Sequence, residues 1–122
     1  MAVRAVRGAT QAAADQREPI MEAVGELVTE MLAANDIDPA DVISMILTST
    51  PDLVSVYPAT AARLAGMEDV PLLSATEVAV PGTMPRVVRV MAHVESPRPR
   101  ADIVHVYLRG TEGLRAAATA PQ

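Results

Sequence analysis

Apolar residues recur along this chain in two different periods, and each period predicts one kind of secondary structure. From a start between Asp15 and Pro19, apolar side chains return every three or four residues, which predicts one long amphipathic helix. This stripe consists of Ile20, Val24, Leu27, Val28, Met31 and Leu32. Asp15 and Glu18 have the spacing of a capping box at its start. A second, short helix is expected over residues 58–65, with Gly66 at its end.

Shorter apolar runs, several of them alternating with polar residues, predict strands. These runs cover residues 2–9, 42–49, 70–73, 86–94 and 103–109. The segment 74–85 is expected to be irregular, because prolines and a glycine interrupt it. The order of elements is therefore βαβαβββ. It predicts an α+β fold with a single mixed β-sheet of about five strands and helices on one face.

The strand predicted over residues 86–94 has two chemically different faces. Its apolar face consists of Val88, Val90, Ala92 and Val94, and its opposite face consists of Val87, Arg89, Met91 and His93. Two helices cannot cover both faces of a sheet of this size, so the apolar face is expected beneath the helices. The mixed face is too apolar for water. We expect it to meet another subunit, with a polar cleft between the subunits.

Composition limits the classes of function. A chain of 122 residues suits one domain, which we expect to span residues 1–115, followed by a flexible tail over 116–122. The net charge of −5 argues against a nucleic-acid partner. The chain has no cysteine and its two histidines lie in no ligand motif, so no metal site is expected. No apolar run could span a bilayer, and we expect a cytoplasmic protein without a membrane partner.

All ten basic side chains are arginines, and one of them interrupts an apolar strand. Arg89 stands within the run 87–94, and Arg7 ends a similar run at residues 2–8. A guanidinium is permanently charged, and burying it without an anionic partner is costly. Arg89 therefore needs either a carboxylate of the protein or an anionic ligand, and the pattern alone leaves both open. The four glutamates at positions 18, 22, 26 and 30 are expected to form a solvated helix face.

The groups suited to chemistry are mostly cations and hydrogen-bond donors. The chain has no nucleophile elbow, no phosphate-binding glycine loop and no metal-ligand cluster. The remaining candidates are Arg7, Arg63, Glu77, Arg89, Tyr107 and Arg115. Such a set suits a reaction that needs binding, orientation and electrostatic stabilisation, with no covalent step.

Six short motifs occur in order along the chain and carry a resemblance to a known family. They are RGAT at 7–10, TPDL at 50–53, YPA at 57–59, a glutamate at 77 before a glycine loop, RVM at 89–91 and HVYL at 105–108. Together they resemble the monofunctional, non-helical (AroH-type) class of chorismate mutase, from about residue 3 to Arg115. The resemblance implies a ferredoxin-like subunit in a homotrimer, a trimeric pseudo-α/β barrel with active sites in the clefts between subunits.

The resemblance also implies a reaction and a role for each site residue. Members rearrange chorismate to prephenate in aromatic amino-acid biosynthesis, without cofactor or metal. Arg7 and Tyr107 would hold a substrate carboxylate. Arg89 would donate to the ether oxygen, and Glu77 would bind the ring hydroxyl. The substrate pocket would also include Tyr57, Arg63, Leu73, Ser74, Ala75, Thr76 and Leu114, and Arg115 would close it.

Several features depart from the family's pattern, among them Tyr57 in place of a phenylalanine and a segment after Arg63 that is one residue shorter, and two other functions stay open. Ser74 stands in place of a cysteine and Thr60 in place of a lysine, which leaves the expected catalytic residues unchanged. Small trimeric imine deaminases, which are hydrolases of similar architecture, also hold a carboxylate with an interfacial arginine. A non-catalytic regulatory module that binds a carboxylate effector would need the same arginines.

Overall fold

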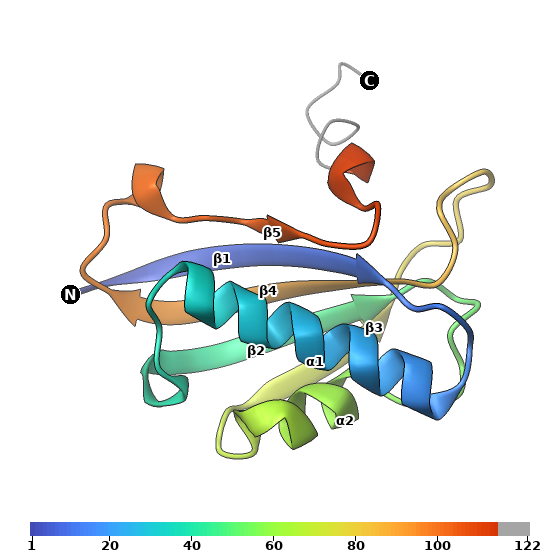
Figure 1. The fold of residues 1–122 in the computed structure, drawn as a ribbon, viewed down its shortest axis with the longest axis horizontal. Coiled ribbons are helices and arrows are strands. Elements are labelled where there is room, and N and C mark those ends of the chain that lie inside the picture. The colour runs from blue at the N-terminus through green and yellow to red at the C-terminus, as the bar shows by residue number, and fades with distance from the viewer. Residues whose placement is uncertain (115–122) are drawn as a thin grey trace.

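The computed structural model describes residues 1–114 as one five-stranded sheet with helices packed against it (Figure 1). Arg115 and the expected tail over 116–122 lie outside the described residues. In chain order, the elements are β1 (Ala2–Gln11), α1 (Arg17–Ala34), η1 (Pro39–Asp41), β2 (Val42–Ser49), α2 (Pro58–Ala62), η2 (Arg63–Met67), β3 (Leu72–Thr76), β4 (Val87–Ser96), η3 (Arg100–Asp102) and β5 (Val106–Tyr107).

The sheet is mixed, as the sequence predicts. Its strand order is β3-β2-β4-β1-β5. The central strand β4 runs antiparallel to both of its neighbours, β1 and β2. The two edge strands are each parallel to their neighbour, β3 to β2 and β5 to β1. The expectation of an α+β fold with a single mixed sheet is confirmed.

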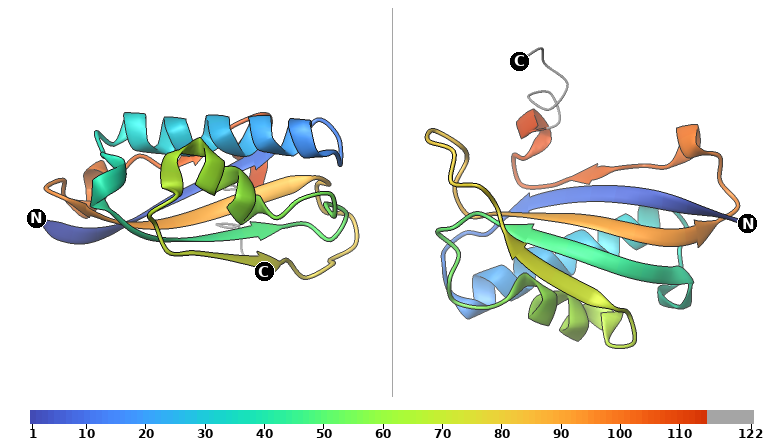
Figure 2. Two further views of the ribbon diagram at one scale, coloured as in Figure 1. Left: turned by 90° about the horizontal axis from the view of Figure 1, so that it is seen from below. Right: turned by 180° about the vertical axis from the view of Figure 1, so that it is seen from behind.

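Both α-helices lie on the same face of the sheet, and Figure 2 shows them as one layer above it. The long helix α1 buries its predicted apolar stripe here, apart from Leu32, which is only partly buried. The sheet contributes the fully or almost fully buried side chains of Val6, Met45, Leu47, Val88, Val90, Ala92 and Val94. The alternation of apolar residues along β4 therefore predicted correctly which of its two faces lies beneath the helices.

The opposite face of the sheet is not covered by any helix of residues 1–114 (Figure 2). Arg7 is exposed on this face, and its Cα partner across β1 and β4 is Met91. Apolar side chains are also exposed here, with Ile46 at 41 % and Leu73 at 62 %. The helix-free face is thus both apolar and cationic, which is the mixture that its sequence predicts.

The third and fifth strands differ from their predicted bounds. β3 runs over Leu72–Thr76 instead of 70–73, because residues 72–76 pair in register with residues 45–49 of β2. β5 is limited to Val106–Tyr107 instead of 103–109. The side chain of Asn35 accepts a hydrogen bond from the backbone N–H of Val104 at 2.7 Å and donates to its carbonyl oxygen at 2.9 Å. Those backbone groups are consequently not available to the sheet.

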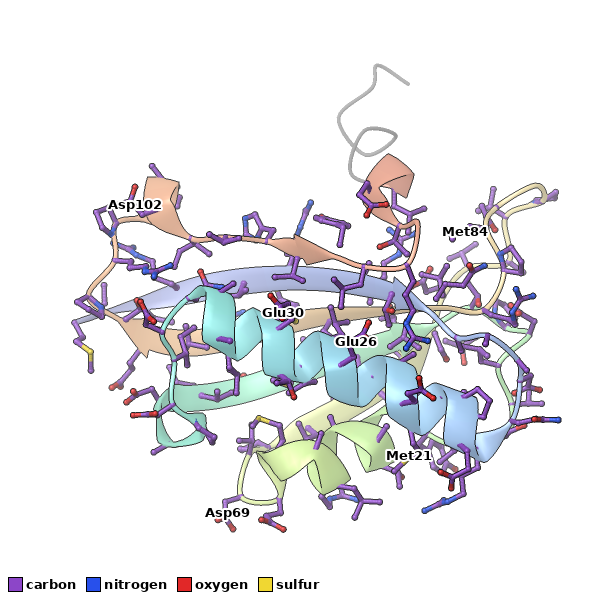
Figure 3. The ribbon with its side chains drawn as sticks, viewed as in Figure 1. Met21, Glu26, Glu30, Asp69, Met84 and Asp102 are labelled. Carbon is purple, nitrogen blue, oxygen red and sulfur yellow. The ribbon has the colours of Figure 1, made fainter. Side chains whose placement is uncertain are left out.

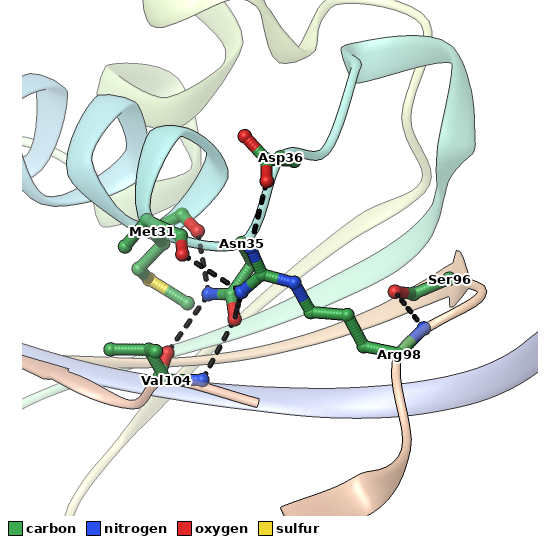
Figure 4. Close-up of polar contacts among 7 residues, drawn as sticks. Met31, Asn35, Asp36, Ser96, Arg98 and Val104 are labelled. Carbon is green, nitrogen blue, oxygen red and sulfur yellow. Dashed lines mark hydrogen bonds and ion pairs between the residues drawn. The ribbon is translucent and has the colours of Figure 1, made fainter. Parts of the chain in front are cut away.

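Asn35 and Arg98 close the carboxyl end of α1 (Figure 4). Asn35 donates to the carbonyl oxygen of Met31, while Arg98 donates from Nη1 to the carbonyl oxygen of Ala34 at 3.0 Å. Arg98 also forms an ion pair with Asp36, with 2.8 Å between Nη2 and Oδ2. A cation at a helix carboxyl end is favourable, because the last carbonyls carry partial negative charge. Arg98 therefore stabilises the carboxyl end of α1, although its sequence position between two prolines, at 97 and 99, is typical of a solvated loop charge.

Asp15 does not cap α1. The N-cap residue is Gln16, which makes no side-chain capping bond. Instead, Asp15 Oδ1 accepts hydrogen bonds from the backbone N–H groups of Val54 and Ser55 at 3.0 and 3.1 Å. The bond from Val54, with help from Ser55, lowers the pKa of Asp15. The carboxylate therefore ties the loop after β2 to the start of α1.

The second helix is shorter than predicted. α2 ends at Ala62, and the chain continues as a single π-helical stretch, η2. Gly66 adopts a φ of 110°, a left-handed conformation that glycine takes at little cost. Gly66 thus interrupts the helical backbone at the position where its end was expected, although the regular α-helix stops four positions earlier, at Ala62, and η2 extends to Met67.

Candidate active site

A groove of about 210 Å³ opens on the helix-free face of the sheet. It lies over three adjacent strands, since Arg89 of β4 is the Cα partner of both Thr48 in β2 and Ala9 in β1. The lining residues are Arg7, Gly8, Ala9, Ile46, Thr48, Arg89, Val90, Met91, Tyr107 and Leu114. The floor of the groove is apolar, and its charged groups are the two arginines.

Arg89 pairs with Glu77 inside the same chain. Their Nε and Oε2 atoms are 3.2 Å apart, with the side chain of Arg89 46 % exposed and that of Glu77 18 % exposed. The guanidinium is therefore not buried in the described structure, although it lies on a strand. Because the ion pair is made through Nε, the two terminal nitrogens keep donors for a second anion. Both of the partners that the sequence left open, a carboxylate and an anionic ligand, are compatible with this geometry.

Glu77 follows β3 directly, and its position is held from two sides. Its backbone N–H donates to the carbonyl oxygen of Ser49 at 2.9 Å, which continues the pairing of β3 with β2. The hydroxyl of Thr48 donates to Glu77 Oε2 at 2.6 Å. Sequence reasoning missed Thr48. The available signal was the alternation along β2, which places Thr48 on the same side of the strand as Ile46, and both residues line the groove.

Arg7 and Tyr107 lie side by side at the other edge of the groove. Arg7 Nη2 donates to the hydroxyl oxygen of Tyr107 at 3.1 Å. The parallel pairing of β1 with β5 sets this contact, since Ala9 and Tyr107 are Cα partners. The backbone N–H of Arg7 donates to His105 Nδ1 at 3.0 Å. A guanidinium and a phenol are thus brought together although 100 positions separate them in sequence.

A second hollow, beneath the loop between β3 and β4, adjoins the groove. It is lined by Thr48, Thr50, Glu77, Val78, Val80, Gly82, Thr83, Met84, Arg89 and Leu114. Thr48, Arg89 and Leu114 line both spaces. Figure 3 shows Met84 on this loop, at the same end of the molecule as the last described turn. The groove and the hollow therefore form one continuous concave surface around Arg89.

The end of the loop before β4 is fixed by Thr50 and Asp52. The backbone N–H of Arg86 donates to Asp52 Oδ2 at 2.8 Å, and that of Val87 donates to Thr50 Oγ1 at 3.1 Å. Burial alone would raise the pKa of Asp52, but hydrogen bonds from Thr50 and Arg86 outweigh it, and the pKa is lowered. These contacts fix the start of the strand that carries Arg89.

The segment that carries Leu114 is anchored by Arg109 and Thr111. Arg109 Nε lies 3.2 Å from Glu26 Oε1, and its Nη2 lies 3.3 Å from Glu22 Oε1. Glu26 first, and then Glu22, raise the pKa of Arg109. The buried Thr111 donates to the carbonyl oxygen of Ala9 at 3.1 Å. The row of glutamates is therefore not only a solvated face, because two of its members hold this segment.

The other predicted pocket residues lie elsewhere on the subunit. Tyr57, Ser74, Ala75 and Thr76 line a separate hollow, which they share with Thr60. The side chain of Tyr57 is 74 % exposed, and Arg63 is exposed on η2. Neither Arg63 nor Leu73 lines the groove of Arg89. The predicted site residues within 1–114 thus form two groups, one in the groove and one around β3 and α2, and Arg115 lies outside the described residues.

Comparison with known proteins gives the family. Residues 3–118 match the family described as chorismate mutase type I. The chain belongs to this family. It is 47 % identical over 114 residues to the chorismate mutase AroH of Thermus thermophilus, covering 93 % of each chain. It is 38 % identical over 116 residues to chorismate mutase AroH of Bacillus subtilis, covering 94 % of this chain and 91 % of the relative.

A solved structure agrees with this family. A chorismate mutase from Clostridium thermocellum superposes with a TM-score of 0.86 at 38 % sequence identity, over 89 % of this chain and 97 % of the other. The resemblance found in the sequence motifs is therefore confirmed. Within residues 1–114, no three His, Asp or Glu side chains are grouped so that they could hold a metal ion. None of the described helices is long and apolar enough to cross a membrane.

Proposed function

We propose that this chorismate mutase family member converts chorismate to prephenate by an intramolecular Claisen rearrangement. In this reaction one carbon–oxygen bond breaks as one carbon–carbon bond forms, within a single dianionic molecule and with no covalent enzyme intermediate. The observation that carries the proposal is the convergence of Arg7, Tyr107 and Arg89 on one groove, with Glu77 in the adjoining hollow and paired with Arg89. The arginines and the phenol can bind an anion and donate hydrogen bonds, and Glu77 can accept one, which suits a reaction that needs orientation and electrostatic stabilisation.

Arg7 and Tyr107 are proposed to hold one carboxylate of the substrate. Their guanidinium and hydroxyl groups are 3.1 Å apart, so an oxygen atom can contact both. Fixing a carboxylate at this edge favours the compact conformer in which the two reacting carbons are close. Much of a barrier can be removed by such preorganisation, since the entropy of orientation is lost on binding and not during the reaction.

Arg89 is proposed to act on the ether oxygen, which gains negative charge as its bond to carbon breaks. Its terminal nitrogens are free to donate there, because the contact with Glu77 uses Nε. A donor aimed at charge that exists only in the transition state accelerates the reaction more than uniform binding does. By analogy with oxyanion-hole donors, Arg89 supplies about 3–4 kcal/mol. Glu77 is proposed to bind the ring hydroxyl and to face the ring as it becomes electron-poor.

The complete site is proposed to form between the subunits of a homotrimer. Two observations support this assembly: the helix-free face exposes Ile46 and Leu73, and the predicted site residues fall into two separate groups. A neighbouring copy would bring its Tyr57, Arg63 and the residues 73–76 to the groove. Three such clefts, walled by sheets with the helices outside, give the pseudo-α/β barrel, and Arg115 would close each site. The proposed reaction needs no cofactor and suits a cytoplasmic enzyme of aromatic amino-acid biosynthesis.

The direct test is to add chorismate to the purified protein in the presence of a chelator. We expect the ultraviolet absorbance of chorismate to fall and prephenate to form. An Arg89→Ala variant should be severely impaired, whereas Arg100→Ala, on the exposed η3, should match the unmodified protein. An absence of prephenate would overturn the proposal. In that case, turnover of an imino acid would indicate a deaminase-like hydrolase, and saturable binding of phenylalanine or tyrosine would indicate a regulatory module.

A further inference from the structure

The hydroxyl of Thr48 holds the carboxylate that pairs with Arg89. Thr48 Oγ1 donates to Glu77 Oε2 at 2.6 Å, and Arg89 Nε lies 3.2 Å from the same oxygen atom. We infer that Thr48 is a positioning residue of the active site, which orients Glu77 and, through it, the guanidinium of Arg89. This inference rests on the proposed function, in which Glu77 and Arg89 contact the substrate.

Thr48 is placed on a rigid element, whereas Glu77 is not. β2 is an interior strand, and in its register Thr48 is the Cα partner of both Arg89 and Ala75. Glu77 lies beyond the end of β3, where the loop 77–86 begins. Its backbone is fixed through Ser49, but its side chain has three rotatable bonds. A β-branched donor has a restricted χ1 angle, so the threonine can select one orientation of the carboxylate.

The two carboxylate oxygens of Glu77 differ in their contacts, and this difference suggests what the bond from Thr48 does for the reaction. Oε2 accepts from Thr48 and pairs with Arg89. The oxygen Oε1 can then receive the ring hydroxyl of the substrate, since an ionised carboxylate has about four acceptor sites. Hydrogen bonds to charged groups are stronger than bonds between neutral groups. Without Thr48, the ion pair alone would set the position of both side chains, each of which is at least partly exposed.

The test compares variants that differ by one hydroxyl group. Thr48→Val, which keeps the branched shape, should lower kcat by about 10-fold and change KM by less than about 3-fold, because orientation is lost while binding groups remain. Thr48→Ser, which keeps the donor, should recover most of this loss. A matched control is Ser44→Ala, which removes a hydroxyl from β2 near His93, outside the groove, and should leave kcat unchanged. If Thr48→Val folds poorly, the pair Thr48→Ser and Thr48→Ala should still differ by about 10-fold.

A double-mutant cycle decides whether Thr48 acts through Glu77. In a Glu77→Ala background, Thr48→Val should have no further effect on kcat, since its acceptor is absent. An equal loss in both backgrounds would mean that Thr48 contacts the substrate itself, and would overturn the inference. A Thr48→Val variant with unchanged kcat would also overturn it. These outcomes differ from failure of the proposed function, which would appear as an unmodified protein that forms no prephenate.

Discussion

The backbone of Gly8 packs closely against Met31 of α1, so that a Cβ atom added at Gly8 would lie only 2.5 Å from Met31 Sδ. The same atom would lie 3.0 Å from Leu27 Cδ1. Gly8 is thus required for close packing of α1 on β1, next to Arg7. We expect Gly8→Ala to lower the free energy of unfolding by about 1–3 kcal/mol through overpacking, as measured by chemical denaturation. Gly113→Ala is the control, since nothing lies within 4 Å of that position; equal losses in both variants would contradict this account.

Asp15 should make stability depend on pH. Its pKa is lowered in the folded state, chiefly by the hydrogen bond from the backbone of Val54. A lowered pKa contributes stability above the ordinary aspartate value of about 4, and this contribution is lost as the pH falls through the folded value. We therefore expect Asp15→Asn to lower the melting temperature at pH 7, and the difference from the unmodified protein to shrink below about pH 4. Asp69→Asn, at an exposed turn (Figure 3), should leave the melting temperature unchanged at neutral pH.

The sequence was sufficient for the parts of this fold that depend on periodicity. Alternation placed Val88, Val90 and Ala92 beneath the helices, and it placed Arg89 and Met91 on the opposite face. Burial of one face fixes the register of a strand, so these assignments follow from local pattern alone. The site could be approached by the same reasoning, because an arginine within an apolar strand was expected to have an anionic partner, and Arg89 does pair with Glu77 although its side chain is 46 % exposed.

The features that could not be predicted from the sequence depend on contacts between segments that are far apart along the chain. The side chain of Asn35 bonds to the backbone of Val104, which shortens β5. Arg98 donates a hydrogen bond to Asp36, which lies 62 positions away in the sequence. A polar side chain near a helix end has several local options, and only the folded chain selects among them. Thr48 was missed for a similar reason. An isolated threonine in a strand is ordinary, and only the nearby carboxylate of Glu77 gives it significance.

Replacement of Arg89 by lysine should be almost as harmful as its removal. The arginine binds Glu77 through Nε and retains two terminal nitrogens, whereas lysine has a single nitrogen that would have to serve both tasks. We expect Arg89→Lys to lower kcat by roughly 100- to 1,000-fold, about 3–4 kcal/mol in the barrier, in steady-state measurements with chorismate. Arg100→Lys on the exposed η3 is the control. A kcat for Arg89→Lys within a few-fold of the unmodified enzyme would show that charge alone is sufficient.

Subunit mixing should reveal whether each site is shared between two copies of the chain. Arg89 and Arg63 belong to the two separate groups of predicted site residues, and Arg63 does not line the groove. We expect Arg89→Ala and Arg63→Ala to be impaired when each is refolded alone. When equal amounts are unfolded together and refolded, about a quarter of the interfaces should combine an intact groove with an intact neighbouring group, and about a quarter of the activity should return. Light scattering should give a mass three times the 12.8 kDa subunit.

The decisive control is a mixture in which both substitutions fall in the same group. Arg89 and Glu77 are 3.2 Å apart within one subunit. Every subunit in a mixture of Arg89→Ala and Glu77→Ala chains therefore lacks one of the two, and no assembly can restore the pair. Recovery in the first mixture and none in the second requires a site built from two subunits. If the first mixture stays inactive, Arg63 acts on the same subunit as Arg89 or not at all, and the proposed arrangement of the trimer is wrong.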